Sequence, residues 1–336
     1  MSQFEILIVF FIINLFLVLN FKKINLFKIV VDKPDRLRKF HKKETALAGG
    51  MILYINVIFY YFFLNSNLEL ILDEIFFQNL NGLNHFILTC SLIFILGIVD
   101  DKLDLNPQKK FSFLILILIQ YIFFDENILI KTIQLSFLNK SIYLGNYSFL
   151  FTLFCFLVFL NAFNMFDGIN LQSSCYTLII LIYFLYLIPN SIFVSFLIIF
   201  ILFFIYLNYS NKSFLGDSGT LLISFILSVI FIKLFNKELI TYSDEILIYM
   251  LIPGIDMIRL FFERIKKKRN PFSYDRLHFH HLLLEKYDYL KTVCIILLFV
   301  SLPIIANHLG FAKLNIIFIS IILYSISILI LKKKNN

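Results

Sequence analysis

The chain has 336 residues, of which 60% are hydrophobic and only 15% are charged, and its net charge is +8. A soluble globular chain is about 45–50% apolar and about 25% charged, so this composition excludes a soluble domain, a disordered chain and a disulfide scaffold. Because each membrane-spanning helix takes about 20 apolar residues, little of the chain is left for a soluble domain. We expect residues 1–336 to form a single polytopic membrane domain.

Eleven apolar runs, each near the length of a membrane-spanning helix, follow one another along the chain. They lie at about 4–20, 47–64, 82–99, 108–124, 148–166, 171–188, 190–207, 214–235, 243–262, 292–308 and 313–331. Such runs are too long for the strands of a membrane barrel, and the first lacks the basic n-region and cleavage site of a signal peptide. Since the fourth run is short and contains Gln120, the sequence predicts an all-α integral membrane protein with 10–11 transmembrane helices.

Lysine and arginine residues lie mainly on one side of these spans, which predicts the orientation in the membrane. Only five of the 30 basic residues fall on the other side, namely Lys131, Lys140, Lys233, Lys237 and Lys313. We therefore expect the N-terminus outside and the C-terminus in the cytoplasm. The cytoplasmic loops are then at about 21–46, 100–107, 167–170, 208–219 and 263–291. This alternation between loops explains the positive charge and argues against a nucleic-acid partner.

Few features point to function on the expected outer side. Residues 129–147 alternate apolar and polar side chains around Asn139-Lys140, which predicts a short β-hairpin. His85 and His308 lie near outer helix ends, and we interpret both as structural. No internal repeat is visible, so the inverted-repeat pattern of many transporters is absent.

Two acidic groups stand out on the expected cytoplasmic side, where ionisable residues at helix ends are candidates for function. Asp100 and Asp101 close the third run, and adjacent carboxylates are best explained by a bound cation or by nearby lysines such as Lys110. Asp217 lies between Gly216 and Gly219, whose missing side chains would let backbone approach a ligand closely. The alternatives are a solvated helix end for the pair and an ordinary N-cap for Asp217.

A third group consists of amides and one carboxylate at the end of the fifth run. Asn161, Asn164 and Asp167 are spaced by three residues, which places them on one helix face, and Asn170 follows. Hydrogen bonding between helices is the alternative explanation for such residues in an apolar helix.

Two basic groups complete the set. The segment RIKKKRNPFSYDRLHFHH combines arginines and histidines, whose donors suit phosphate oxygens, and it lacks the HExxH pattern of a zinc protease. The residues concerned are Arg264, Arg269, Arg276, His278, His280 and His281. Earlier in the chain, Lys39 and His41 precede the pair Gly49-Gly50. A purely topological basic loop and helix packing at the glycines are the alternatives.

The five groups together predict one site at the inner membrane surface. Carboxylate and amide oxygens suit Mg²⁺ or Mn²⁺ rather than zinc, and the surrounding basic residues suit phosphates. A metal-bound diphosphate needs both sets at once. A transporter is expected to place such groups near the bilayer midplane instead. The residues therefore favour transfer of a phosphoryl or phosphosugar group from a soluble donor to a lipid.

The segments RKFH…AGG, GIVDDKLDL, NAFNMFDGIN, FLGDSGT and PFSYDRLHFHH resemble, in order, the motifs of the polyprenyl-phosphate N-acetylhexosamine-1-phosphate transferases. That family includes the phospho-N-acetylmuramoyl-pentapeptide transferase, and the resemblance covers about residues 30–285. It implies transfer of a sugar 1-phosphate from a UDP-sugar to undecaprenyl phosphate, with Mg²⁺ and release of UMP, in the bacterial inner membrane. The HxHH form of the last motif favours the GlcNAc-1-phosphate branch. The muramoyl-pentapeptide transferase and a lipid-linked sugar transporter are the alternatives.

The resemblance also implies roles for single residues. Asp217 matches the principal metal ligand, assisted by Asn164, whereas Asp100, Asp101 and Asp167 match catalytic carboxylates. The remaining matched residues are expected to bind the substrates: Lys39, His41, Lys110, Asn161, Asn170, Arg264, Arg269, Arg276, His278, His280 and His281. Asn170 stands where the family often has a second Asp, and Ala46 where it often has Pro. Members are often dimeric, although no GxxxG motif in this chain predicts an interface.

Overall fold

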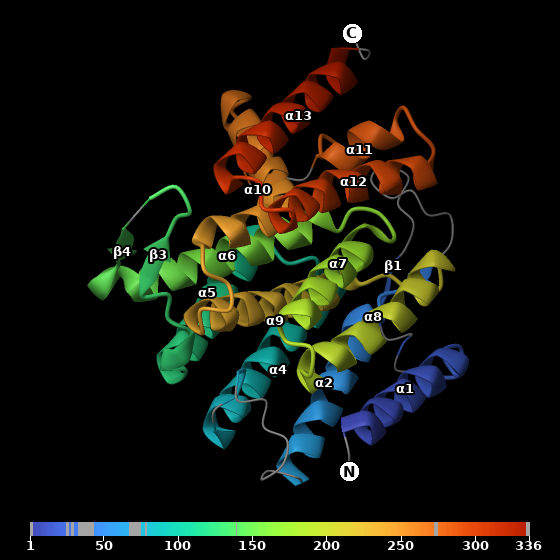
Figure 1. The fold of residues 1–336 in the computed structure, drawn as a ribbon. Helices are drawn as coiled ribbons and strands as arrows, with labels where there is room; N and C mark the ends of the chain where they lie inside the picture. The colour runs from blue at the N-terminus through green and yellow to red at the C-terminus, as the bar shows by residue number, and fades with distance from the viewer. Residues whose placement is uncertain are drawn as a thin grey trace.

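The computed structural model describes residues 3–24, 27, 30–32, 44–66, 75–77, 79–138, 140–271 and 275–333. Each of the eleven predicted apolar runs coincides with a helix in it (Figure 1). These helices are α1 (Gln3–Leu19), α2 (Gly49–Ser66), α4 (Leu80–Leu103), α5 (Pro107–Phe124), α6 (Ser148–Phe166), α7 (Gln172–Leu187), α8 (Ile192–Tyr209), α9 (Gly216–Asn236), α10 (Ser243–Lys266), α12 (Tyr289–His308) and α13 (Lys313–Lys333). A further short helix, α11 (Phe279–Leu284), lies outside the eleven apolar runs.

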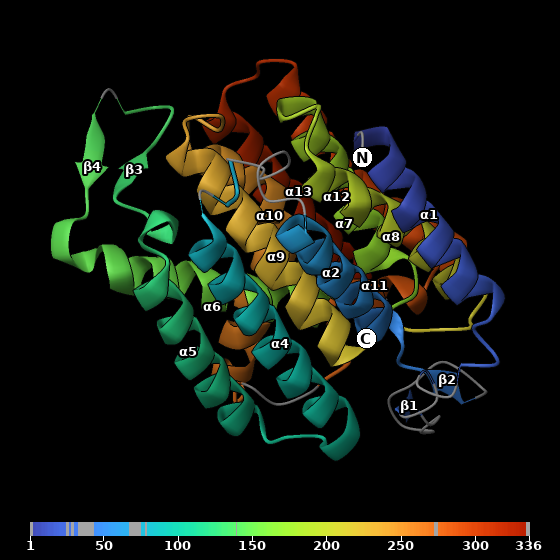
Figure 2. The same ribbon diagram turned by 90° about the horizontal axis from the view of Figure 1, so that it is seen from below.

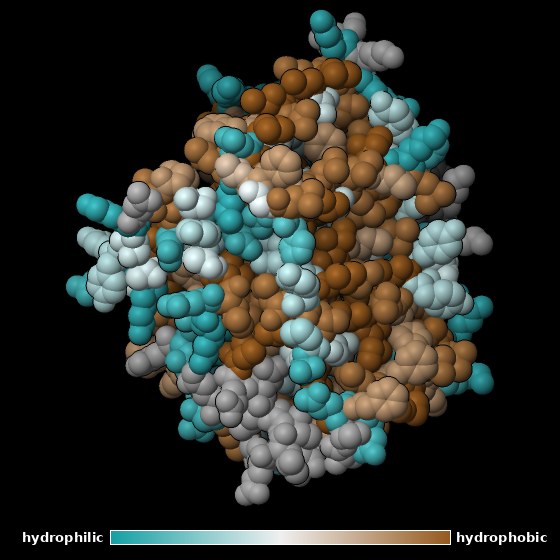
Figure 3. All heavy atoms as spheres, viewed as in Figure 1, coloured by the Kyte–Doolittle hydropathy of each residue, from teal (hydrophilic) through white to brown (hydrophobic). Residues whose placement is uncertain are grey.

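Seven of the described helices are long and apolar enough to cross a membrane, which supports the prediction of an all-α polytopic membrane protein. They are α4, α5, α6 with the 3-10 turn before it, α8, α9, α12 and α13. Helices α1, α2 and α7 are apolar but shorter, and α10 carries charged residues in its second half. The count of 10–11 spans and the orientation remain predictions. Apolar side chains cover much of the face shown in Figure 3.

Helix α9 forms the centre of the bundle. It packs against α2, α4 and α6 (Figures 1 and 2). The apolar part of α9 that is long enough to cross a membrane is buried along its whole length. A helix that is apolar all round is expected to be buried on every side, and between Leu221 and Ile232 the only polar residues of α9 are Ser224 and Ser228. Because α9 begins at Gly216, its N-terminus holds the FLGDSGT motif against the ends of the surrounding helices.

Two short antiparallel ribbons lie outside the bundle. Strand β3 (Thr132–Gln134) pairs with β4 (Ser141–Tyr143), which confirms the predicted β-hairpin, although Asn139 at its turn lies outside the described residues. The second ribbon, β1 (Val31–Asp32) with β2 (Thr45–Ala46), was not predicted. Ala46 also bridges to Ser213, so the segment before α2 lies beside the segment before α9 (Figure 2).

Glycines let three helices meet closely at the start of α9. A Cβ atom at Gly50 of α2 would lie 2.5 Å from the Ser218 hydroxyl oxygen, and one at Gly97 of α4 would collide with the Ser218 backbone. Helix packing therefore accounts for Gly50, the alternative that the sequence left open. The close approach also places the end of α4, with its two carboxylates, directly against Asp217.

Candidate active site

A cavity of about 890 Å³ opens where α4 ends and α9 begins. Its wall is formed by residues from the ends of α4 and α6, the loop after α6, the segment between α8 and α9, and the region of α11 and α12, together with Asp32 of β1 and Leu47 before α2. Seven of the residues predicted for the site line it: Asp100, Asp101, Asn164, Asp167, Asn170, Asp217 and His281. Segments that lie far apart in the sequence thus contribute to one wall, as the motif analysis expected.

Asp101 binds the N-terminus of α9. Its Oδ1 accepts a hydrogen bond from the Asp217 N–H at 2.7 Å, and its Oδ2 accepts one from the Ser218 N–H at 3.0 Å. The first N–H groups of a helix have no partner within the helix, and a negative charge there is favourable. Gly216 has a left-handed φ of 72°, and a Cβ on it would meet the Asp101 carboxylate at 2.8 Å. Asp101 therefore fixes α9, and Asp217 with it, to the end of α4.

Lys110 forms ion pairs with the carboxylates of Asp100 and Asp217. Its ammonium nitrogen lies 2.6 Å from Asp100 Oδ2 and 2.7 Å from Asp217 Oδ1. The second oxygen of Asp100 accepts the Leu105 N–H at 2.9 Å, whereas that of Asp217 has no partner among the described residues. The ammonium neutralises part of the repulsion between Asp100 and Asp217. A nearby lysine therefore accounts for Asp100, one member of the predicted acidic pair, whereas Asp101 is held by the N-terminus of α9.

Asp167 and Asn164 approach the same cavity from the end of α6. The Thr220 hydroxyl donates to Asn164 Oδ1 at 2.7 Å, and the Ser173 hydroxyl donates a short hydrogen bond to Asp167. Burial raises the pKa of Asp167 to about 7, the Ser173 bond opposes this shift, and the charge of Asp217 adds to it. Asp167 therefore exchanges its proton near neutral pH, where binding of a cation would expel it.

The oxygen donors fit a hard divalent cation by their chemistry. Six aspartates and four asparagines line the cavity, and carboxylate and amide oxygens suit Mg²⁺. Within the described part of the chain, however, no group of three or more His, Cys, Asp or Glu side chains is already arranged as a metal site. The contacts of Lys110 account for this, because its ammonium holds Asp100 and Asp217. A cation at Asp217 would compete with Lys110.

A row of amides forms another part of the wall. Asn170 Nδ2 donates to Asn211 Oδ1 at 2.6 Å, and Asn208 Oδ1 accepts the Leu171 N–H at 2.6 Å. Tyr289 supports the row by donating its hydroxyl to the Asn170 carbonyl at 2.7 Å. Asn208, Asn211 and Tyr289 were not predicted from the sequence to belong to the site. The signal for the two asparagines was their place directly before the FLGDSGT motif.

The three histidines form a stack that reaches the cavity at one end. The rings of His278 and His280 are parallel, with centroids 5.3 Å apart, and His280 contacts His281 at 4.2 Å. His281 lines the cavity, and His280 lies so close to Gly168 that no side chain would fit there. Burial, with its charged neighbours, lowers the pKa of His280 well below its ordinary value and that of His281 to about 4. Both are therefore neutral hydrogen-bonding groups at physiological pH.

Other predicted binding residues do not line the cavity. Arg264 is buried and bonds Asp275 at 2.7 Å and the Pro271 carbonyl at 2.8 Å, so it anchors the loop before α11. Arg269 and Arg276 are exposed, and the Asn161 amide donates to Leu157 in its own helix. Lys39 and His41 lie outside the described residues. A substrate contact by any of these residues remains a prediction.

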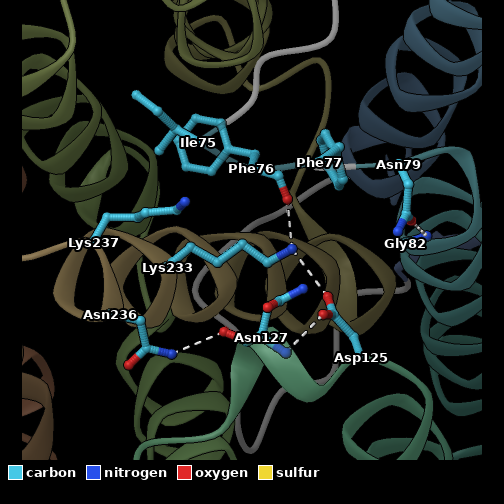
Figure 4. A pocket seen from close by; sticks show the side chains of 10 residues that line it. All are labelled: Ile75, Phe76, Phe77, Asn79, Gly82, Asp125, Asn127, Lys233, Asn236 and Lys237. Carbon is cyan, nitrogen blue, oxygen red and sulfur yellow. Dashed lines mark hydrogen bonds and ion pairs between the residues drawn. The ribbon is translucent and has the colours of Figure 1, made fainter.

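A second cavity, of about 190 Å³, lies at the opposite end of α9 and contains none of the predicted residues (Figure 4). Lys233 points between the Asp125 carboxylate, at 3.0 Å, and the Phe76 carbonyl, at 2.5 Å. Asn236 donates to the Asn127 carbonyl at 2.8 Å. These contacts tie the end of α9 to two loops, and we interpret this group as structural.

Comparison with known proteins agrees with the motif analysis. Residues 83–235 match the family described as Glycosyl transferase family 4. A protein of Thermotoga maritima named undecaprenyl-phosphate alpha-N-acetylglucosaminyl 1-phosphate transferase is 27% identical over 295 residues, covering 87% of this chain and 85% of the relative. Proteins of the same name from Yersinia pestis and Escherichia coli O157:H7 are 25% and 24% identical over 268 residues, or 76% of this chain and 70% and 69% of theirs. The chain is therefore similar to glycosyl transferase family 4 over residues 83–235 and to proteins named undecaprenyl-phosphate alpha-N-acetylglucosaminyl 1-phosphate transferase over most of its length, in agreement with the resemblance of its motifs to the polyprenyl-phosphate N-acetylhexosamine-1-phosphate transferases.

Proposed function

We propose that the protein transfers a sugar 1-phosphate from a UDP-sugar to undecaprenyl phosphate and releases UMP. The donor we propose is UDP-N-acetylglucosamine, or a closely similar N-acetylhexosamine donor. The names of the curated relatives support the acceptor and the sugar. The cluster of Asp100, Lys110 and Asp217 on a cavity at one end of an apolar bundle carries the proposal. We place this site at the cytoplasmic face of the bacterial inner membrane.

The chemistry requires an anion to attack another anion. An oxygen of the lipid phosphate attacks the phosphorus that carries the sugar, and the bond from this phosphorus to the oxygen of the leaving UMP breaks. One phosphoanhydride forms as another is lost, so the reaction is expected to be reversible. A phosphomonoester has its second pKa near 6, so the lipid phosphate is mostly a dianion at neutral pH and needs no strong base.

Asp100 is accordingly assigned an electrostatic role. Its carboxylate is 6% exposed and bonded to both Lys110 and the Leu105 N–H, so it is poorly placed to receive a proton from a substrate. It holds the Lys110 ammonium at the cavity, where a positive charge favours the transfer of a phosphoryl group. Asp101 holds the start of α9 and thereby orients Asp217.

The remaining walls suit the two parts of the donor. A bound Mg²⁺ would supply charge neutralisation and Lewis acidity, and Asp217, Asn164 and Asp167 are the residues expected to hold it. The amides of Asn170, Asn208 and Asn211 present donors and acceptors of the kind that a uracil base or an N-acetyl group requires. Neutral His281 offers a further hydrogen bond at the cavity wall.

Release of UMP by the purified protein tests the proposal. The protein would receive undecaprenyl phosphate and Mg²⁺ with UDP-GlcNAc, UDP-GalNAc or UDP-MurNAc-pentapeptide in separate reactions, and Asp217→Asn would serve as the inactive control. We expect release with UDP-GlcNAc and none without lipid. Release only with UDP-MurNAc-pentapeptide would assign the chain to the muramoyl-pentapeptide branch. Binding of the lipid without UMP release from any donor would instead favour a transporter.

A further inference from the structure

The histidine stack rests on a buried carboxylate that belongs to none of the motifs. Asp256 of α10 is 6% exposed, and its Oδ2 lies 2.9 Å from His278 Nδ1. Its Oδ1 accepts the Phe279 N–H, the first of helix α11, at 3.1 Å. A carboxylate can only accept in such a bond, so Nδ1 of His278 carries the proton. One side chain thus sets both the tautomer of His278 and the start of the helix that carries His280 and His281.

Two residues hold Asp256 in turn. Tyr324 of α13 donates its hydroxyl to Asp256 Oδ1 at 2.5 Å, and the Arg259 guanidinium bonds the same oxygen at 2.8 Å. Arg259 also donates to the Leu277 carbonyl at 2.6 Å and to the Tyr324 hydroxyl at 2.8 Å. The group of Asp256, Arg259 and Tyr324 therefore connects α10, α13 and the loop before α11.

The contacts continue from this group to the cavity. His278 stacks on His280, His280 packs against Gly168 and contacts His281, and His281 lines the cavity. Gly168 follows Asp167 directly, so a shift of the stack would disturb both His281 and the loop that carries Asp167. Asp256 itself does not line the cavity, and its effect on the reaction must be transmitted by the imidazoles.

We propose that Asp256 is a positioning residue for the transfer reaction, which holds the three-histidine stack against the active-site cavity, with Tyr324 of the C-terminal helix as its support. The test of this inference by UMP release rests on the proposed function, whereas its test by NMR of the histidines does not. Residues that orient a functional side chain from behind typically contribute about 10–100-fold to activity. Asp256→Asn keeps the shape of the side chain and removes its charge, so we expect UMP release to slow by about this factor.

The matched control is Asp125→Asn. Asp125 is 4% exposed and ion-paired with Lys233 at 3.0 Å, but it lies at the opposite end of α9. Both variants lose a buried charge, and thermal unfolding would compare their stabilities. We expect Asp125→Asn to retain the wild-type rate per folded molecule. A loss of equal size in the two variants would show that Asp256 acts only through stability and would overturn the proposal.

Nitrogen NMR of protein with labelled histidines measures the tautomers of the imidazole rings. These should not change if Asp256 contributes only to the stability of the fold. The wild type is expected to show His278 protonated at Nδ1, and Asp256→Asn to show a changed tautomer together with shifted His281 signals. Unchanged histidine signals, or a wild-type rate in Asp256→Asn, would contradict the proposal. If the wild type released no UMP at all, the proposed function would fail, and the NMR comparison would still decide whether Asp256 holds the stack.

Tyr324→Phe covers the case in which Asp256→Asn does not fold. It removes one hydrogen bond to Asp256 and leaves the His278 contact in place, so we expect a loss of roughly 2–10-fold with an unchanged tautomer. A wild-type rate in Tyr324→Phe, when Asp256→Asn cannot be studied, would overturn the part assigned to the C-terminal helix and with it the proposal.

Discussion

Substitution of Lys110 by methionine should strengthen the binding of a divalent cation while it abolishes transfer. The Lys110 ammonium lies 2.7 Å from the same Asp217 carboxylate that a cation requires, and 2.6 Å from Asp100. Methionine has a similar length and no charge, so the variant frees both carboxylates without leaving a large void.

The contact with Asp217 sets the size of the effect. A hydrogen bond to a charged group contributes about 1.5–3 kcal/mol, and a cation that takes Asp217 must break or share this contact. Removal of the competition should tighten cation binding by a similar free energy, which corresponds to about 10–150-fold in Kd. Transfer should nevertheless fall by about 100-fold or more, because a positive charge aimed at the reacting phosphates is lost.

Binding of Mn²⁺ followed by electron paramagnetic resonance would measure the affinity, and UMP release would measure transfer. Lys109→Met is the matched control, because Lys109 is the neighbouring residue and is exposed; it should change neither quantity. Equal or weaker Mn²⁺ binding in Lys110→Met would refute the reasoning, since it would mean that the cation does not use the carboxylates that Lys110 holds.

Three further changes test other parts of the site. Asp101→Asn removes the charge that binds the first N–H groups of α9, so the free energy of unfolding should fall by about 1–2 kcal/mol. The reaction of a thiol-reactive dye with Cys90, which is buried in the folded protein, would measure this change. The raised pKa of Asp167 means that the folded protein keeps a proton there that the unfolded chain has lost; metal-free protein should therefore lose stability as pH rises from about 4 to about 7. Thermal unfolding in EDTA would measure this loss of stability in the wild type, and the loss should be smaller in Asp167→Asn. An equal loss in the two proteins would show that Asp167 is not its cause. Gly168→Ala places a methyl group against His280; overpacking of this kind costs about 1–3 kcal/mol, and UMP release should fall more than in Gly254→Ala, where a Cβ meets open space.

The sequence was sufficient to predict the helices because a bilayer allows few alternatives. Each span must satisfy its own backbone hydrogen bonds and present an apolar surface, so every apolar run became a helix. The clustering of Asp100, Asp167 and Asp217 was also predictable, since the alternation of loop charge places the ends of alternate helices on one side of the membrane.

The roles of single residues depended on contacts that no local pattern reveals. Asp101 and Asp100 are adjacent and chemically identical, yet one caps a distant helix and the other holds a lysine. Arg264 was expected to bind substrate, but the described contacts are with Asp275 and a backbone carbonyl. Asp256 was missed because it lies alone in a hydrophobic stretch, and only folding brings it to His278.

Exchange of labelled UMP into UDP-GlcNAc tests the central claim most directly. If an oxygen of the lipid phosphate displaces UMP in a reversible reaction, the purified protein should incorporate label into UDP-GlcNAc only when product lipid, formed from undecaprenyl phosphate, and Mg²⁺ are both present. Asp217→Asn should abolish the exchange. Exchange that proceeds without any lipid would contradict direct transfer, and the absence of exchange in folded protein that binds both substrates would contradict the proposed reaction itself.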